Sequence, residues 1–180
     1  MSFDLFAVRS VLFLPASNPR AIARARESAA DLVVLDLEDA VKPGDKAAAR
    51  EAAMDAVTSH WRMPVAIRIN GIGTEWHSLD LDAVARPEAY VAVLPRAASA
   101  HLVSEVREAI GKPLLAMIET AAGVLTAPAV AHEAAALIAG TNDLSGDLRL
   151  PADAGRAPLQ MALQTIVLSA RAAGIAGFVG

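Results

Sequence analysis

The chain has 180 residues, a length that suits one domain over residues 1–180. Its formal net charge of -4 offers no basic field for a nucleic-acid backbone, so we expect no nucleic-acid partner. The absence of cysteine excludes disulfides, thiolate metal sites and cysteine nucleophiles, and it fits a reducing cytoplasm.

The longest stretch without a charged residue, 157–170, is too short and too polar for a membrane span, which needs about 20 apolar residues. The amino terminus has Asp4 ahead of Arg9 and lacks the charged, apolar and small-residue pattern of a signal peptide. We therefore expect a cytoplasmic protein with no membrane segment and no export.

Six short apolar runs rich in strand-forming residues occur along the chain, and each is followed by a helical stretch. The runs are 11–15, 32–37, 65–70, 90–95, 114–119 and 137–143. Their spacing is close to the roughly 30 residues of a strand, a crossover helix and a parallel return strand. Asn18 is expected to cap the first helix, and Gly111 and Gly174 to end later ones. A seventh strand is expected at 176–180.

Polar residues stand at nearly every expected strand end, and this distinguishes two architectures. They are Ser17, Asp36, Glu38, Asp39, Arg68, Asn70, Arg96, Glu119 and Asp143. In a (β/α)8 barrel all carboxyl strand ends face one site, whereas an open doubly wound sheet uses fewer of them. We therefore predict a (β/α)8 TIM-barrel type fold. It is expected to be incomplete at the C-terminus, with six βα units and the start of strand 7.

Glu119 closes an apolar run, and a buried carboxylate there would need protonation, an arginine or a metal ion. Asp143 ends the next run, and Mg²⁺ commonly binds one or two carboxylates with water and substrate. An acidic residue at a strand end is also often a helix N-cap or a solvated loop group. Arg68 is ambiguous too, since it suits either a structural counter-ion or a substrate carboxylate.

The four histidines show neither metal-ligand spacing nor a motif partner. We expect them on helix or loop surfaces and place none in the site.

Six segments in order resemble the citrate lyase beta-subunit (CitE-like) branch of the HpcH/HpaI aldolase family. They are Arg-Ser-Val-Leu-Phe-Leu-Pro (9–15), Val-Val-Leu-Asp-Leu-Glu-Asp-Ala-Val (33–41), Arg-Ile-Asn (68–70), Leu-Pro-Arg (94–96), Met-Ile-Glu-Thr (117–120) and Gly-Thr-Asn-Asp-Leu (140–144). The resemblance implies a Mg²⁺-dependent lyase. Such an enzyme cleaves CoA thioesters such as citryl-, malyl- or citramalyl-CoA into acetyl-CoA and a 2-oxo acid. It also implies a homo-oligomer, a trimer or hexamer.

By the same resemblance, Glu119 and Asp143 match the metal ligands. Glu38 and Asp39 match the acidic pair that touches metal-bound water, and Arg68 matches the residue that holds the oxo-acid carboxylate.

Three further residues are expected to contact the substrate, namely Arg9, Asn70 and Arg96. Arg9 lies in the segment that matches the region receiving the CoA arm. The sequence departs from the family pattern at Arg96, where a lysine is usual, and at Ala98, where an acid is usual.

Two alternatives stay open for function, and three explanations for the completeness of the chain. The chain is also compatible with a pyruvate- or oxaloacetate-handling aldolase that does not use CoA, and with a binding or assembly subunit that has lost turnover. Because about two strands of the barrel are missing, we expect a truncated chain, closure by another subunit, or an inactive relative.

Overall fold

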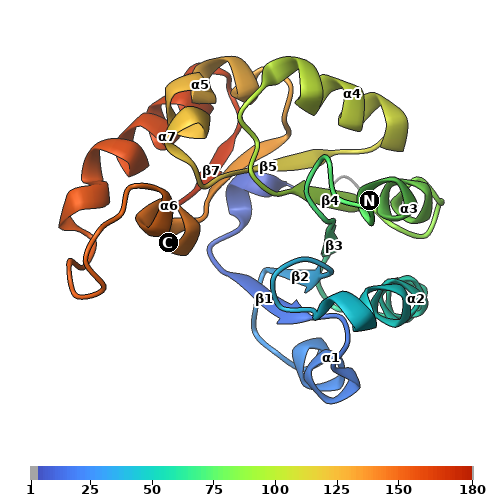
Figure 1. Cartoon of the computed structure of the whole chain (residues 1–180). Helices are drawn as coiled ribbons and strands as arrows, with labels where there is room; N and C mark the ends of the chain where they lie inside the picture. Colours follow the sequence, from blue (N-terminus) through green and yellow to red (C-terminus); the bar gives the residue numbers. More distant parts are fainter. Residues whose placement is uncertain (1–3, 180) are drawn as a thin grey trace. The chain divides into compact units, whose positions relative to one another are not determined.

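The strands of the chain follow one another in space as they do in sequence. In this computed structural model, which describes residues 4–179, the sheet has the strand order β1-β2-β3-β4-β5-β6-β7. At least one helix separates each consecutive pair of strands (Figure 1). In a doubly wound sheet the strand order reverses at one point, whereas the order of the seven described strands shows no reversal. The expected fold class, an incomplete (β/α) barrel, is confirmed.

The first of two compact units comprises the described residues up to Val93 together with Glu108–Pro113. Its strands and longer helices are β1 (Val11–Pro15), α1 (Pro19–Arg26), β2 (Leu32–Asp36), α2 (Lys46–Val57), β3 (Val65–Arg68), α3 (His77–Val84) and most of β4 (Val91–Leu94). Three short 3₁₀ helices occur in the described residues, η1 (Leu5–Ala7), η2 (Pro43–Asp45) and, in the second unit, η3 (Ala157–Leu159). The pairs β1–β2, β2–β3 and β3–β4 are all parallel.

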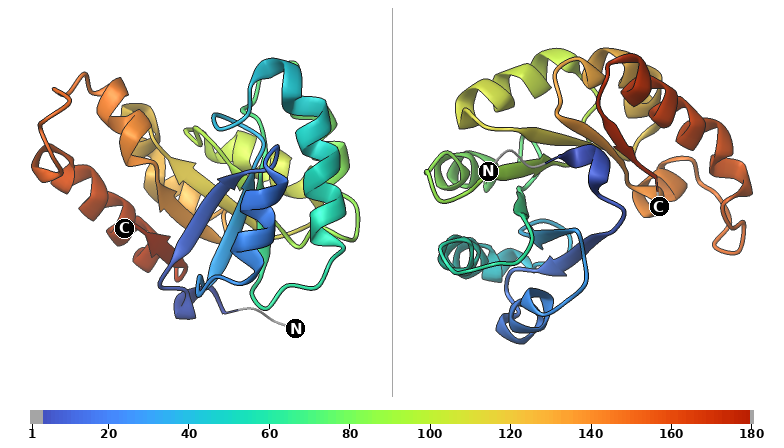
Figure 2. Two further views of the ribbon diagram at one scale, coloured as in Figure 1. Left: turned by 90° about the horizontal axis from the view of Figure 1, so that it is seen from below. Right: turned by 180° about the vertical axis from the view of Figure 1, so that it is seen from behind.

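The second unit comprises Leu94–Arg107 and the described residues from Leu114 onward. Its elements are most of α4 (Ala100–Ile110), β5 (Leu114–Ile118), α5 (Ala121–Ala131), β6 (Ala136–Ala139), α6 (Thr141–Asp147), α7 (Gln160–Ala172) and β7 (Ala176–Phe178). Its strands pair in parallel as β5–β6 and β6–β7. Helices α5 and α7, gold and red in Figure 2, pack against each other.

Local signals in the sequence explain where most elements begin and end. Asn18 caps α1, because its side-chain oxygen accepts the backbone N–H of Ala21 at 3.1 Å, and Pro19 occupies the first turn. Gly111 and Gly174 adopt φ values of 62° and 72°, the left-handed conformation that ends a helix. These three expectations are confirmed. Of the expected seventh strand, Ala176–Phe178 is confirmed, and Gly180 lies outside the described residues.

The expected sixth strand, 137–143, was wrong at its carboxyl end. Strand β6 stops at Ala139, and Asp143 lies in the first turn of α6. The backbone N–H of Gly140 donates to the carbonyl of Ile118, and the carbonyl of Gly140 then accepts the N–H of Leu144 to start the helix. An acidic residue is favoured in the first turn of a helix because this turn is the positive end of the helix dipole.

Candidate functional site

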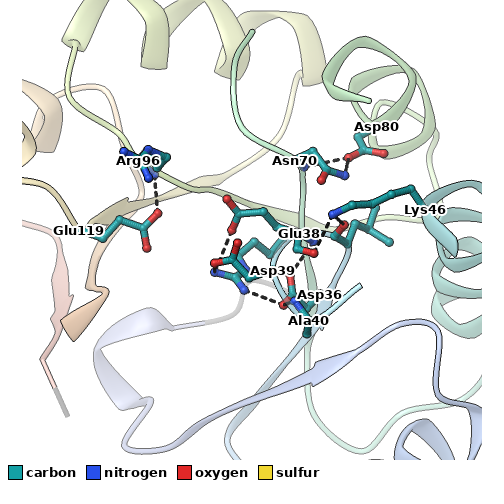
Figure 3. A network of polar contacts seen from close by, with 11 residues as sticks. Asp36, Glu38, Asp39, Ala40, Lys46, Asn70, Asp80, Arg96 and Glu119 are labelled. Atoms are coloured by element: carbon teal, nitrogen blue, oxygen red, sulfur yellow. Dashed lines mark hydrogen bonds and ion pairs between the residues drawn. The ribbon is translucent and has the colours of Figure 1, made fainter. Parts of the chain in front are cut away.

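A buried charge cluster lies at the carboxyl ends of β2 and β3 in the first unit. Asp36 and Arg68 are register partners, so the two last strand residues stand side by side. The Arg68 Nε and Nη2 donate to Asp36 Oδ1 and Oδ2 at 2.8 Å and 2.6 Å, which is a bidentate ion pair. Arg68 Nη1 lies 2.9 Å from Glu38 Oε2 and 3.9 Å from Asp39 Oδ2. The cluster thus joins Arg68 to three carboxylates. These are Asp36, Glu38 and Asp39, which are labelled in Figure 3.

The guanidinium of Arg68 is charged in this setting. Burial lowers its pKa, but the hydrogen bond to Asp36 and the charges of Asp36, Glu38 and Asp39 outweigh burial and raise the pKa above its ordinary value. Arg68 was expected to serve either as a counter-ion or as a carboxylate ligand. In the structure it is paired with Asp36 and Glu38, so any substrate carboxylate would share Arg68 with these two acids.

The backbone after β2 is held by Asp36 and by a lysine that sequence reasoning did not select. Asp36 Oδ1 accepts the N–H of Glu38 at 2.8 Å, and Oδ2 accepts the N–H of Ala40 at 3.2 Å. Lys46 Nζ donates to the carbonyl oxygens of Leu37 and Glu38, both at 2.7 Å. Burial lowers the pKa of Lys46, and the nearby carboxylates, Asp36 foremost, partly oppose that change.

Asn70, an expected substrate contact, is bound to a second buried carboxylate. Its side chain is 2% exposed, and both its backbone N–H and its Nδ2 donate to Asp80 Oδ2, at 2.8 Å and 2.6 Å. Asp80 is fully buried, and its other oxygen accepts Arg50 Nε at 2.6 Å. His77, half-buried at the start of α3, has its Nδ1 2.8 Å from the main-chain carbonyl oxygen of Asn70.

One sequence pattern could have pointed to Lys46 and Arg50 as residues near the site. They are four residues apart, hence on one face of α2, in the helix that follows the acidic strand end. Asp80 gave no such signal, because only the folded chain brings it to Asn70.

The second unit contains a buried carboxylate of its own. Glu119 directly follows β5, is 2% exposed, and accepts the backbone N–H of Arg96 on Oε1 at 2.8 Å (Figure 3). Arg96 adopts a left-handed φ of 51°, and its side chain is exposed, so its described contact with Glu119 is made by the main chain. Gly140 lies against the same carboxylate. A Cβ at Gly140 would come within 2.6 Å of Glu119 Cβ and would also collide with Oε2.

Asp143 lies one turn beyond Gly140 in α6, and its side chain is exposed. Helix α6 is tied to the segment after Glu119, since Asp147 Oδ2 accepts the N–H of Ala121 at 2.7 Å. Among residues 4–179, no group of three or more His, Asp or Glu side chains is placed to hold a metal ion. Glu119 and the exposed Asp143 supply carboxylate oxygens, the kind of ligand that Mg²⁺ takes alongside several waters.

Arg9 lies apart from these contacts. Its side chain is 86% exposed, and its Nη2 is 3.6 Å from Asp31 Oδ1. Asp31 contacts the main chain of this segment more closely than the Arg9 side chain, because its Oδ2 accepts the backbone N–H groups of Arg9 and Ser10, both at 2.9 Å. These hydrogen bonds, with that of the Ser10 hydroxyl, hold the pKa of Asp31 below its usual value.

Parallel strands in sequential order, with carboxylates and an arginine at their carboxyl ends, define a protein of the (β/α)-barrel class. The sequence model described as HpcH/HpaI aldolase/citrate lyase matches residues 9–179. The chain belongs to this family, and the resemblance drawn from its motifs is confirmed.

One curated relative and two solved structures illustrate the relationship. The chain is 37% identical to a (3S)-malyl-CoA thioesterase of Cereibacter sphaeroides, with 97% of this chain and 63% of the relative covered. The citrate lyase beta subunit of Mycobacterium tuberculosis, solved with oxaloacetate and magnesium, matches with a TM-score of 0.80 and 33% identity over 95% of this chain and 78% of that one. Protein CitE of the same organism, solved with magnesium, acetoacetate and coenzyme A, matches with a TM-score of 0.83 and 34% identity over 96% of this chain and 66% of that one.

The chain spans about 63% of the length of the curated malyl-CoA thioesterases that it matches. Within the described residues, no helix combines the length and the apolar character that a membrane crossing requires.

Proposed function

We propose that the protein is a Mg²⁺-dependent carbon–carbon lyase acting on a CoA thioester of the citryl-, malyl- or citramalyl-CoA type, with acetyl-CoA and a 2-oxo acid as products. In this reaction the substrate hydroxyl loses its proton as the carbon–carbon bond breaks. The bonding electrons pass to the α-carbon of the thioester, which is then protonated. The observation that carries the proposal is Glu119, a carboxylate that is 2% exposed after β5 and oriented by a main-chain N–H.

Glu119 and Asp143 are the residues that would hold Mg²⁺. A bound Mg²⁺ would supply positive charge to substrate oxygens as negative charge develops on them. The N–H of Arg96 fixes one oxygen of Glu119, and Gly140 leaves room for the other. Two solved relatives support the cation, since one carries magnesium with oxaloacetate and the other carries magnesium with acetoacetate and coenzyme A.

Arg68 is proposed to hold the carboxylate of the oxo acid, with Glu38 and Asp39 as acidic neighbours. Its planar fork matches a carboxylate in two parallel hydrogen bonds, and Asp36 already fixes the plane of that fork. Asn70 is buried and its side-chain Nδ2 donates to Asp80, so its side-chain oxygen Oδ1 is the group it would offer to a substrate. Arg9 and Arg96 have exposed side chains and are proposed to meet the CoA portion.

Thioester hydrolysis is a second candidate, because relatives 34–37% identical to this chain are named (3S)-malyl-CoA thioesterase. Hydrolysis breaks the carbon–sulfur bond and releases malate and free CoA, whereas the lyase reaction leaves the thioester intact in acetyl-CoA.

The test is an incubation with (3S)-malyl-CoA, citryl-CoA and citramalyl-CoA, each with Mg²⁺ and with EDTA. Acetyl-CoA is measured by liquid chromatography and the oxo acid by hydrazone formation. Free CoA is measured with a thiol reagent, which has no protein background because the chain lacks cysteine. Acetyl-CoA and oxo acid in equal amounts, formed only with Mg²⁺, support the lyase. Free CoA supports the thioesterase, and binding without any product refutes both.

Variants connect the reaction to the residues. Glu119→Gln is expected to abolish Mg²⁺-dependent turnover. Arg68→Lys keeps the charge but loses the fork, so the KM is expected to rise at least tenfold. Arg107→Lys is the matched control, since Arg107 pairs with Glu133 at 3.0 Å and has no proposed role in the reaction. Equal losses in Arg68→Lys and Arg107→Lys would count against the role of Arg68.

A further inference from the structure

The turn after β2, residues 37–40, carries Glu38 and Asp39 and is held from two directions. Asp36 accepts two of its N–H groups, those of Glu38 and Ala40. Lys46 donates to two of its carbonyl oxygens, those of Leu37 and Glu38. The Glu38 carbonyl also accepts the N–H of Val41 at 2.9 Å, which closes the turn. Donors and acceptors on both sides therefore fix the peptide planes from which the two acidic side chains project.

Lys46 occupies a position where a lysine is costly. It is the first residue of α2, it is 5% exposed, and its ammonium lies 5.1 Å from the centre of the Trp76 ring. Burying an ammonium carries a desolvation cost that an apolar residue of similar volume avoids. Helix packing alone does not require the charge. The charge is instead used in the two hydrogen bonds that the ammonium donates to carbonyl oxygens and in its contact with the aromatic ring.

We propose that Lys46 is a positioning residue, which holds the 37–40 turn so that the carboxylates of Glu38 and Asp39 face Arg68 in the arrangement that catalysis requires. The proposal rests on the proposed function for its link to turnover. Its structural part, the hold on the turn, is independent of that function. Lys46 touches backbone oxygens and not substrate, so it acts through Glu38 and Asp39.

The chain offers a matched control in Lys112. This lysine is half-buried, its pKa is also lowered by burial, and its Nζ also donates to two carbonyl oxygens, those of Val84 and Arg86. It belongs to the same compact unit as Lys46 but holds the end of α3. Lys46→Met and Lys112→Met therefore remove the same kind of contact, once at the acidic turn and once elsewhere.

The first measurement is amide hydrogen exchange at Glu38 and Ala40, whose N–H groups bind Asp36. In Lys46→Met we expect exchange at these two amides to rise at least tenfold. In Lys112→Met they should stay within twofold of wild type. Unchanged exchange at Glu38 and Ala40 in Lys46→Met overturns the proposal.

The second measurement is turnover of the CoA thioester. We expect kcat to fall at least tenfold in Lys46→Met with KM changed less than threefold, and both constants to be unaltered in Lys112→Met. Faster exchange with unchanged kcat overturns the positioning role. Faster exchange in a protein whose wild type cleaves no thioester upholds the hold on the turn and refutes the proposed function instead.

A chemical rescue keeps the test decisive if Lys46→Met folds poorly. Because the chain has no cysteine, Lys46→Cys creates a single thiol, and bromoethylamine converts it into a lysine analogue of the same length. The modification is made in urea before refolding, with Lys112→Cys treated in parallel. Restored kcat and restored protection at Glu38 and Ala40 support the proposal. Restored protection without restored kcat contradicts it.

Discussion

Replacement of Gly140 by alanine tests the close approach of two segments around Glu119. Gly140 has an ordinary φ of -90°, so an alanine there is not strained by its backbone. Its Cβ would instead meet Glu119, with Glu119 Cβ at 2.6 Å and Cδ at 3.3 Å. The carboxylate end of Glu119 can rotate away, but its Cβ is fixed by the backbone that follows β5. Either β5 or the start of α6 has to move.

The expected cost follows from this overlap. Forcing an extra methyl group into a packed site costs about 1–3 kcal/mol of unfolding free energy. For a chain of this size, that lowers Tm by roughly 2–12 °C. Gly146 is the matched control, because it lies within the same helix and a Cβ there meets nothing within 4 Å. Gly146→Ala should stabilise the chain by about 0.5–1 kcal/mol, the usual gain from alanine in a helix.

The assay is urea denaturation of both variants, followed by calorimetric titration with MgCl₂ in the presence of oxaloacetate. Because Gly140→Ala displaces Glu119, we expect Mg²⁺ affinity to fall at least tenfold, while Gly146→Ala binds like wild type. If Gly140→Ala is as stable as Gly146→Ala, the steric reasoning is wrong. If it is destabilised but binds Mg²⁺ unchanged, Glu119 is not a metal ligand.

Three other substitutions give separate checks of the structure. Asn18→Ala removes the cap of α1 and should cost about 1 kcal/mol in chemical denaturation, whereas Asn18→Asp should cost little. Asp80→Ala should cost about 3–5 kcal/mol because it leaves Arg50 without its buried partner, and a cost under 1 kcal/mol would contradict that pairing. Asp31 has a lowered pKa in the folded state, so its contribution is complete above the unfolded value of 3.8 and is lost as pH falls through the folded value. The stability gap between wild type and Asp31→Asn should therefore be constant near neutral pH and narrow below about pH 4, as urea midpoints will show.

The strands and their order were predictable because their signals are local. Each apolar run starts a new βα unit, and the first strand, Val11–Pro15, matches its expected range at both ends. The end of β6 was not predictable in the same way. The N–H of Gly140 still bonds to the carbonyl of Ile118 in β5, and the chain leaves the sheet after it because the carbonyl of Gly140 accepts the N–H of Leu144 at the start of α6.

The candidate site shows the same division. Strand alternation and the barrel pattern were enough to group Asp36, Glu38 and Arg68, and the register pair Asp36–Arg68 explains why. Lys46 escaped because its partners are main-chain carbonyl oxygens, and Asp80 escaped because only the folded chain brings Asn70 and Arg50 to it. A buried ion is recognised from its desolvation and its partners, and both are properties of the folded chain.

The charges of the first unit bear on how Arg68 would accept a substrate. Four carboxylates and three cations interact electrostatically in this unit. The carboxylates are Asp36, Glu38, Asp39 and Asp80, and the cations are Lys46, Arg50 and Arg68. Such a group has no excess positive charge with which to attract a second anion, although Arg68 has the geometry to bind one. Carboxylate binding at Arg68 therefore needs either a competing cation for the acids or a displacement of Glu38. This requirement favours a cation-dependent site over one in which Arg68 acts alone.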